Sequence, residues 1–215
     1  MSSPMPGMSK PVVVLFGPLS PSLSESNLTT LRATILSSSQ YAWIDQVLTS
    51  LPSHYQSLVT ECPDLYNKAS EAQIVELAAW LKTGHLVLDR ERMPNSLLAP
   101  LVVIAQLVQY SAFLDPQDVV QELPMVGETV GFCIGLLSAF AVSLSHQSTA
   151  TEFEQNAAVA VRLAMLAGCI VDQQHLRDPR GPSKTFSVAW KRVDSRDNRK
   201  ELDSILEKFR DVSLP

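Results

Sequence analysis

The fold of this chain is decided by residues 124–142, which read PMVGETVGFCIGLLSAFAV. The part before residue 131 predicts a loop and a short strand, and the apolar part after residue 135 predicts a helix. Gly131 and Gly135 flank Cys133 at a spacing of two residues on either side, which predicts a sharp turn between that strand and that helix. We therefore expect an α/β fold in which this turn presents the cysteine.

Such a turn suits a nucleophile for three reasons. It holds Cys133 in a strained backbone conformation, and glycines two residues away remove the collisions that side chains would cause. The thiol then lies at the N-terminus of the following helix, where the helix dipole favours a thiolate. The backbone N–H of Ile134 points to where an oxyanion would develop. A Gly-x-Cys-x-Gly string also occurs in ordinary buried turns, so the pattern alone leaves both interpretations open.

The rest of the chain predicts few strands and many helices. Residues 12–16, VVVLF, predict a buried strand of a parallel sheet that ends at Gly17 and Pro18. Helices are expected from residue 27 onward and over 41–51, 69–81, 101–114, 152–171 and 201–209, with a further strand over 185–190. The expected buried face of the helix over 152–171 consists of Val159, Leu163, Leu166 and Ile170. This order indicates an α/β class with helices in excess.

Composition excludes several kinds of protein. The 215 residues carry 17 Lys and Arg against 22 Asp and Glu, a net charge of −5, which does not suit a nucleic-acid surface. Hydrophobic residues make up 46% of the chain, enough for a folded core. No apolar run reaches the roughly 18 residues that would cross a membrane, and the first residues do not resemble a signal peptide. Three scattered cysteines predict neither a disulfide framework nor a metal site. We expect a cytoplasmic protein that binds neither nucleic acid nor membrane.

The residues around Cys133 resemble the active-site segment of starter unit:ACP transacylase domains, which stand at the N-terminus of fungal non-reducing polyketide synthases. Other stretches resemble the same family in the same order along the chain. They are LFGP at 15–18, VIAQLVQY at 103–110, the helix over 157–172, FSVAW at 186–190 and the last helix over 202–209. The resemblance therefore covers nearly the whole chain from Val12 to Phe209.

This resemblance implies a fold and an activity. The family is similar to malonyl-CoA:ACP transacylases, with a large α/β-hydrolase-like lobe and a small ferredoxin-like lobe. Residues 12–215 would form a large lobe that is incomplete at its C-terminus, the small lobe would be missing, and residues 1–11 would be a disordered leader. Cys133 would accept an acyl starter unit from a donor thioester on a fatty acid synthase or polyketide synthase. It would pass that group to the phosphopantetheine thiol of an acyl carrier protein, in secondary metabolism, with no bound cofactor or metal.

The chain departs from the family pattern at two places. Family members carry a glutamine near the oxyanion hole where this chain has Leu19, whose backbone N–H remains a candidate second oxyanion donor. The family's catalytic histidine lies beyond the segment that resembles residues 202–209, and this chain has no counterpart to it. Surface or capping roles are expected for all four histidines, His54, His85, His146 and His175. His175, expected in a loop, is the best substitute base among the four.

Several alternatives stay open. The chain is either a piece of a longer synthase or a short stand-alone relative. In place of an enzyme it could be a non-catalytic relative that binds a carrier protein or synthase, or a cysteine hydrolase built on the same turn. We expect Arg162 to be structural, because the family takes uncharged acyl groups, and Cys169 to be a core thiol. Gln106 is expected to pack or cap in preference to lining a tunnel.

Overall fold

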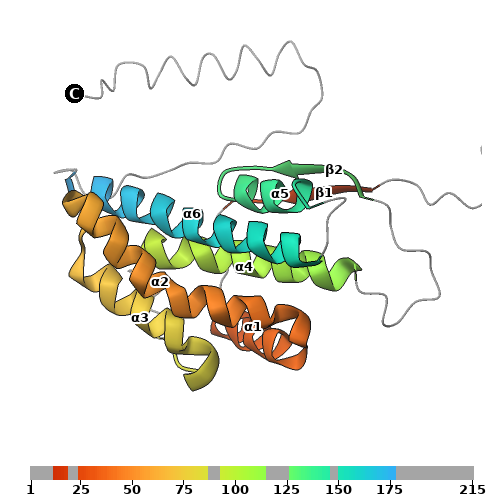
Figure 1. The fold of residues 1–215 in the computed structure, drawn as a ribbon, viewed down its shortest axis with the longest axis horizontal. Helices are drawn as coiled ribbons and strands as arrows, with labels where there is room; N and C mark the ends of the chain where they lie inside the picture. The colour runs from red at the N-terminus through yellow and green to blue at the C-terminus, as the bar shows by residue number, and fades with distance from the viewer. Residues whose placement is uncertain (1–11, 19–23, 87–92, 115–125, 146–149, 178–215) are drawn as a thin grey trace, which may run out of the picture. The chain divides into compact units, whose positions relative to one another are not determined.

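The computed structural model describes residues 12–18, 24–86, 93–114, 126–145 and 150–177 (Figure 1). Contacts divide the chain into two units, residues 1–181 and 182–215, and every described residue belongs to the first. The leader over 1–11, the strand over 185–190 and the helix over 201–209 lie outside the described residues. So do Leu19 and His146.

A two-stranded parallel sheet joins two segments that lie far apart in the sequence. Strand β1 (Val12–Phe16) pairs with β2 (Val126–Gly131), and Phe16 stands opposite Gly131. Both strands were expected, and β1 was expected to belong to a parallel sheet. The expectation that β1 is buried holds for only one face, because Phe16 is buried whereas Val13 and Leu15 are 63% and 69% exposed. Parallel strands usually have both faces covered, but the helices described here cover one side of this pair.

Helices dominate the described part of the chain and confirm the expected helix-rich α/β class. Two of them, α4 and α6, pack side by side at the centre, and α5 lies between this pair and the sheet (Figure 1). The helices are α1 (Glu25–Ser37), α2 (Ala42–Glu61), α3 (Lys68–Thr83), α4 (Asn95–Leu114), α5 (Gly135–Ser143) and α6 (Ala150–Arg177), with short 3₁₀ turns at Ser39–Tyr41 and Pro63–Leu65.

Two helices continue through prolines that lie just outside the helices expected over 41–51 and 101–114. Helix α2 runs through Pro52, and α4 begins at Asn95 and runs through Pro100. Each proline removes one backbone hydrogen bond from the helix. Buried side chains on both sides of each proline, such as Leu51 before Pro52 and Leu101 after Pro100, pack into the core. Tertiary packing therefore outweighs the local cost of the proline.

The buried face of α6 also differs from the prediction. Val159, Leu163 and Ile170 are 50%, 44% and 42% exposed, and Leu166 is half-buried. The buried face consists mainly of small residues, namely Ala157, Ala160, Val161, Ala164, Met165, Gly168 and Cys169. The reason is the close approach of α4, because a Cβ added to Gly168 would lie 2.2 Å from the carbonyl oxygen of Asn95. Small side chains at the contact allow two helix axes to come close together.

The N-terminus of α4 is capped from a distant part of the chain. The carboxylate of Asp172, on α6, accepts hydrogen bonds from the backbone N–H groups of Asn95 (2.8 Å) and Ser96 (2.9 Å), and from the Asn95 side-chain amide (2.9 Å). These N–H groups have no partner within their own helix. A negative charge at a helix N-terminus also favours the helix dipole. This contact fixes the position of α4 along the axis of α6.

The sequence pattern predicted no membrane-spanning stretch, yet two helices meet that criterion by length and composition. They are Asn95–Leu114 and Ala150–Gln173, whose apolar windows are 50% and 39% buried inside the protein. Core helices commonly pass the same test, so on its own it is weak evidence for a membrane. In this structure the two helices pack mainly on each other.

Candidate active site

Cys133 lies at the turn between β2 and α5, in the geometry that the sequence predicts. Its φ angle is +57°, and no other non-glycine residue in the described part of the chain has a positive φ. A side chain in this left-handed region costs about 1–2 kcal/mol. The turn is closed by hydrogen bonds from Gly135 N–H to the Phe132 carbonyl (3.1 Å) and from Leu136 N–H to the Cys133 carbonyl (3.0 Å). The thiol of Cys133 is exposed.

Both flanking glycines are required by the backbone around them. A Cβ on Gly131 would lie 2.4 Å from the Cα of Leu136. A Cβ on Gly135 would lie 2.3 Å and 2.4 Å from the carbonyl oxygens of Gly17 and Phe16. The backbone N–H of Phe132 donates to the carbonyl of Phe16 at 3.0 Å. The turn is therefore seated directly on the end of β1, with no space for a methyl group at either glycine.

The N–H of Ile134, the predicted oxyanion donor, lies directly before the first residue of α5. Ile134 has helical backbone angles at the N-cap position of α5, and its N–H has no acceptor among the described residues. In such a turn the thiolate can attack a carbonyl carbon, and the neighbouring N–H can donate a hydrogen bond to the resulting oxyanion. The catalytic roles of Cys133 and Ile134 stay predictions. The second candidate donor, Leu19, follows the described residues Gly17 and Pro18 but lies outside the described part of the chain.

A half-buried glutamine connects the end of β1 to the helix after the turn. The side-chain amide of Gln106, on α4, donates to the carbonyl of Gly17 at 2.9 Å. Its side-chain oxygen accepts from the hydroxyl of Ser138, on α5, at 2.7 Å. Ser138 is completely buried. Sequence reasoning placed Gln106 among packing residues and did not single out Ser138; the available signal was a polar pair in two strongly apolar helices.

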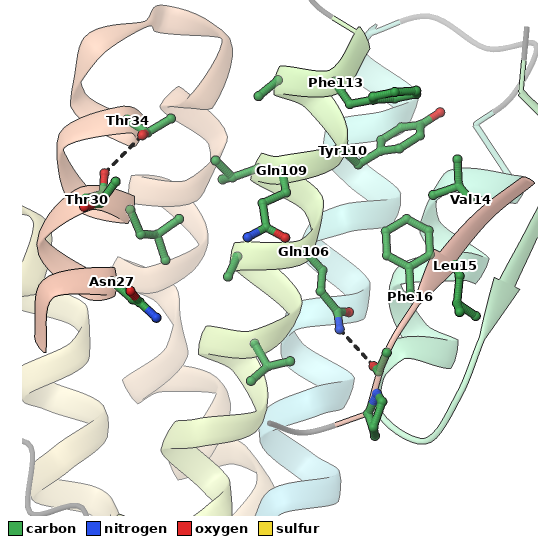
Figure 2. Close-up of a pocket in the computed structure, with 17 residues that line it drawn as sticks. Val14, Leu15, Phe16, Asn27, Thr30, Thr34, Gln106, Gln109, Tyr110 and Phe113 are labelled. Atoms are coloured by element: carbon green, nitrogen blue, oxygen red, sulfur yellow. Dashed lines mark hydrogen bonds between the residues drawn. The ribbon is translucent and has the colours of Figure 1, made fainter. Parts of the chain in front are cut away.

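A cavity of about 900 Å³ lies between β1, α1 and α4 (Figure 2). Its wall is mostly apolar, and Figure 2 shows Gln106 reaching across it from α4 to the end of β1. Polar side chains from α1 and α4 also line it, among them Asn27, Thr30, Thr34 and Gln109. Phe16 and Gly17 belong to this wall and are also the residues on which Gly135 rests. The cavity and the cysteine turn therefore share the end of β1.

The two histidine side chains that the structure describes, His54 and His85, lie on or after helices other than the one that follows the cysteine turn. His54, on α2, is half-buried, and burial together with the positive charge of Arg162 lowers its pKa. His85 is exposed after the end of α3. Among the described side chains, none of the histidines makes a hydrogen bond to Cys133.

His175 lies inside α6, whereas we expected it in a loop. Asp172 sits at Asn95, the first residue of α4, and His175 follows Asp172 by three residues. Gln106, which contacts the helix after the turn, lies eleven residues further along α4, a rise of about 16 Å. The backbone of His175 therefore belongs to the end of the α4–α6 pair that is remote from Cys133. This placement removes the argument that a returning loop brings His175 to the turn.

The remaining candidates are Arg162 and the other two cysteines. The positive charge of Arg162, on α6, contributes to the lowered pKa of His54 on α2, and the structural role of Arg162 stays a prediction. Cys169 is buried, and burial followed by the charge of Asp172 raises the pKa of its thiol to about 12. Cys62 is exposed at the end of α2. Within the described residues no cluster of three or more His, Cys, Asp or Glu side chains could hold a metal ion.

Comparison with known proteins gives a consistent result. A family model described as "Starter unit:ACP transacylase in aflatoxin biosynthesis" matches residues 24–213. The non-reducing polyketide synthase epaA of Aspergillus niger is 37% identical over 204 residues, which cover 94% of this chain and 8% of the relative. Clavatol synthase claF of Penicillium crustosum is 37% identical over 208 residues, covering 93% of this chain and 8% of the relative. The chain thus spans about a twelfth of the length of these relatives.

Proposed function

Because this chain belongs to the starter unit:ACP transacylase family, we propose that it transfers an acyl starter unit from a donor thioester to an acyl carrier protein of a fungal polyketide synthase. The acyl group would be held on Cys133 between the two steps. The observation that carries the proposal is the position of Cys133, an exposed thiol at φ +57° between two glycines that nothing larger can replace. The names of the relatives, which are polyketide synthases, support the pathway.

The proposed chemistry consists of two thioester exchanges. The thiolate of Cys133 attacks the acyl carbonyl carbon, a C–S bond forms, and the carbonyl π electrons move to oxygen, where the Ile134 N–H stabilises them. The intermediate collapses, the donor sulfur leaves with the electrons of its C–S bond, and it takes up a proton from solvent. The phosphopantetheine thiolate of the carrier then repeats these steps on the acyl-cysteine and releases Cys133. Because the thioesters have similar energies, positioning and oxyanion stabilisation matter more than driving force.

We place the acyl chain in the cavity between β1, α1 and α4. Its wall is mainly apolar, and its volume of about 900 Å³ lies within the roughly 300–1,000 Å³ that is typical of small-molecule sites. The cavity meets the turn at Phe16 and Gly17, so a group attached to Cys133 has an apolar space beside the strand on which the turn rests.

Intact-protein mass spectrometry tests the first step. The chain is mixed with acetyl and hexanoyl thioesters, alongside Cys133→Ala and Cys62→Ala. Cys62 is the matched control because it is also an exposed thiol, whereas Cys169 is buried. We expect one acyl group on the parent and on Cys62→Ala, and none on Cys133→Ala. Acylation of Cys133→Ala to the same extent as the parent would refute Cys133 as the nucleophile.

Addition of a carrier protein that bears phosphopantetheine tests the second step. We expect the acyl group to leave Cys133 and to appear on the carrier thiol. Release of free acid instead would identify a cysteine hydrolase.

The absence of a histidine bonded to Cys133 among the described side chains favours one alternative, a non-catalytic relative that binds a carrier protein or synthase. General-base catalysis commonly contributes a factor of about 10²–10⁴. Carrier binding without any acylation, measured by calorimetry with the same proteins, would support that alternative and refute acyl transfer by this chain.

A further inference from the structure

Gln106 links three elements that meet at the cysteine turn: β1 through Gly17, α5 through Ser138, and its own helix α4. We propose that Gln106 is a positioning residue for acyl transfer, which fixes the first turn of α5 against the end of β1 and so sets where Cys133 and the Ile134 N–H lie. The inference rests on the proposed function for its kinetic consequence, although the positioning itself can be measured without it.

The hydrogen bonds determine how the amide of Gln106 is oriented. The carbonyl of Gly17 can only accept, so the NH₂ group of Gln106 must face it. The side-chain oxygen of Gln106 can only accept, so the hydroxyl of Ser138 must donate to it. Both ends of the amide are therefore satisfied in one orientation and in no other. Because Ser138 is completely buried, water does not compete for its hydroxyl.

The atoms held by Gln106 are those that support the turn. The carbonyl oxygen of Gly17 receives the Gln106 amide and is also the atom that a Cβ on Gly135 would approach to 2.3 Å. Ser138 lies four residues after Ile134, one helical turn along α5, so it holds the same side of that helix. A movement of the Gly17 carbonyl or of Ser138 would therefore shift Cys133 and Ile134 together. Misplacement of reacting groups by about 1 Å can cost a factor of about 10² in rate.

Substitution of Gln106 tests the effect of losing its two hydrogen bonds. Gln106→Leu keeps the approximate size of the side chain and loses both bonds, and we expect kcat for Cys133 acylation to fall about 10–100-fold with a smaller change in KM. Gln73→Leu is the control, because Gln73 is a half-buried glutamine on α3 whose side-chain oxygen has no partner among the described residues. An acylation rate of Gln106→Leu equal to that of Gln73→Leu would overturn the proposal.

Gln106→Glu provides a rescue that a purely space-filling role would not show. As a carboxylate, Glu still accepts from Ser138 but faces the Gly17 carbonyl without a proton to donate. As a carboxylic acid it donates to Gly17 and accepts from Ser138, as the amide does. We expect the kcat of Gln106→Glu relative to the parent, measured at each pH, to rise as the pH is lowered from 8 to 5. A ratio that stays constant over this range would refute the hydrogen-bond role.

Alkylation of Cys133 by iodoacetamide, in a Cys62→Ala background, reports the placement of the thiol without any acyl transfer. We expect Gln106→Leu to change the alkylation rate and to speed hydrogen exchange of the amides over 132–138, whereas Gln73→Leu changes neither. If the parent fails to acylate but these two effects are present, the proposed function fails and the positioning role stands. If the parent acylates and both effects are absent, the positioning role fails alone.

Discussion

The strain at Cys133 is a property of a single residue, and it can be measured by removing its cause. The left-handed backbone region penalises any side chain with a Cβ but not glycine. Cys133 is exposed, so truncation of its side chain removes little packing. The turn therefore keeps a residue that is poorly suited to its backbone at the position where we propose the chemistry occurs.

We expect Cys133→Gly to be more stable than Cys133→Ala by about 1 kcal/mol. Both variants lack the thiol, so they differ mainly in whether a Cβ must occupy a φ angle of +57°. Urea denaturation followed by circular dichroism gives the two free energies of unfolding. Equal stabilities, or a more stable alanine variant, would show that the turn relaxes and stores no strain.

Gly135→Ala tests the contact of the turn with β1. The added Cβ would overlap two backbone carbonyl oxygens, so we expect a loss of about 3 kcal/mol in the free energy of unfolding. Gly17→Ala is the control, because a Cβ there would have no atom within 4 Å. Thermal denaturation should place Gly17→Ala close to the parent and Gly135→Ala well below it; similar midpoints for the two variants would contradict the close approach.

The cysteine turn was predictable from the sequence, whereas the residues that support it were not. The spacing of Gly131, Cys133 and Gly135 is local, and the strain that it implies concerns only neighbouring backbone atoms. The bond of Gln106 to Gly17 joins residues 89 positions apart, and the bond to Ser138 joins residues 32 positions apart. No local pattern encodes such pairs, because they depend on how three elements pack.

At the scale of the elements, α4 and α6 show why periodicity alone is insufficient. Hydrophobic periodicity located α6 correctly but selected its large residues, such as Leu163, as the buried ones. The close approach at Gly168 buries the alanine face instead. The helices around Pro52 and Pro100 are also longer than expected. The free energy gained by burying the neighbours of each proline depends on tertiary packing, which the local sequence does not show. His175 was expected in a loop but is helical, because α6 continues beyond Asp172, the residue that caps the N-terminus of α4.

Asp172→Ala should destabilise the pair of helices by about 2 kcal/mol. The substitution leaves the N–H groups of Asn95 and Ser96 without their acceptor and removes a negative charge from the N-terminus of α4. Glu76→Ala, an exposed acid on α3, is the control and should change the stability by less than about 0.5 kcal/mol. Chemical denaturation of both variants checks this; a loss in Glu76→Ala as large as that in Asp172→Ala would exclude a specific cap.

For the molecule as a whole, the surface of α5 next to the turn carries exposed apolar side chains. Three residues at intervals of four form what we call the α5 stripe: Leu136 and Phe140 in α5 and its C-cap residue Leu144, which are 47%, 55% and 67% exposed. Residues four apart lie on one face of a helix. Single exposed apolar residues are normal on a protein surface, but contiguous ones favour association.

Phe140→Lys should reduce concentration-dependent self-association of the 215-residue chain, because it places a charge in the α5 stripe. Val75→Lys is the matched control, since Val75 is similarly exposed, at 53%, but lies on α3 outside the stripe. Size-exclusion chromatography with light scattering over a range of concentrations gives the average mass. The same reduction in both variants would mean that added charge alone, and not the stripe, sets the association.

The parallel pairing of β1 with β2 has a consequence for synthesis on the ribosome. The two strands are separated by about 110 residues, so β1 must wait for most of the described chain to be made before its partner exists. At about 5–20 residues per second, this delay is on the order of 10 seconds. During this delay the backbone N–H and C=O groups of five consecutive apolar residues, Val12–Phe16, have no strand to pair with. Unpaired apolar segments of this kind are bound by chaperones and promote aggregation. The order of translation, more than the strength of the finished sheet, decides how long that exposure lasts.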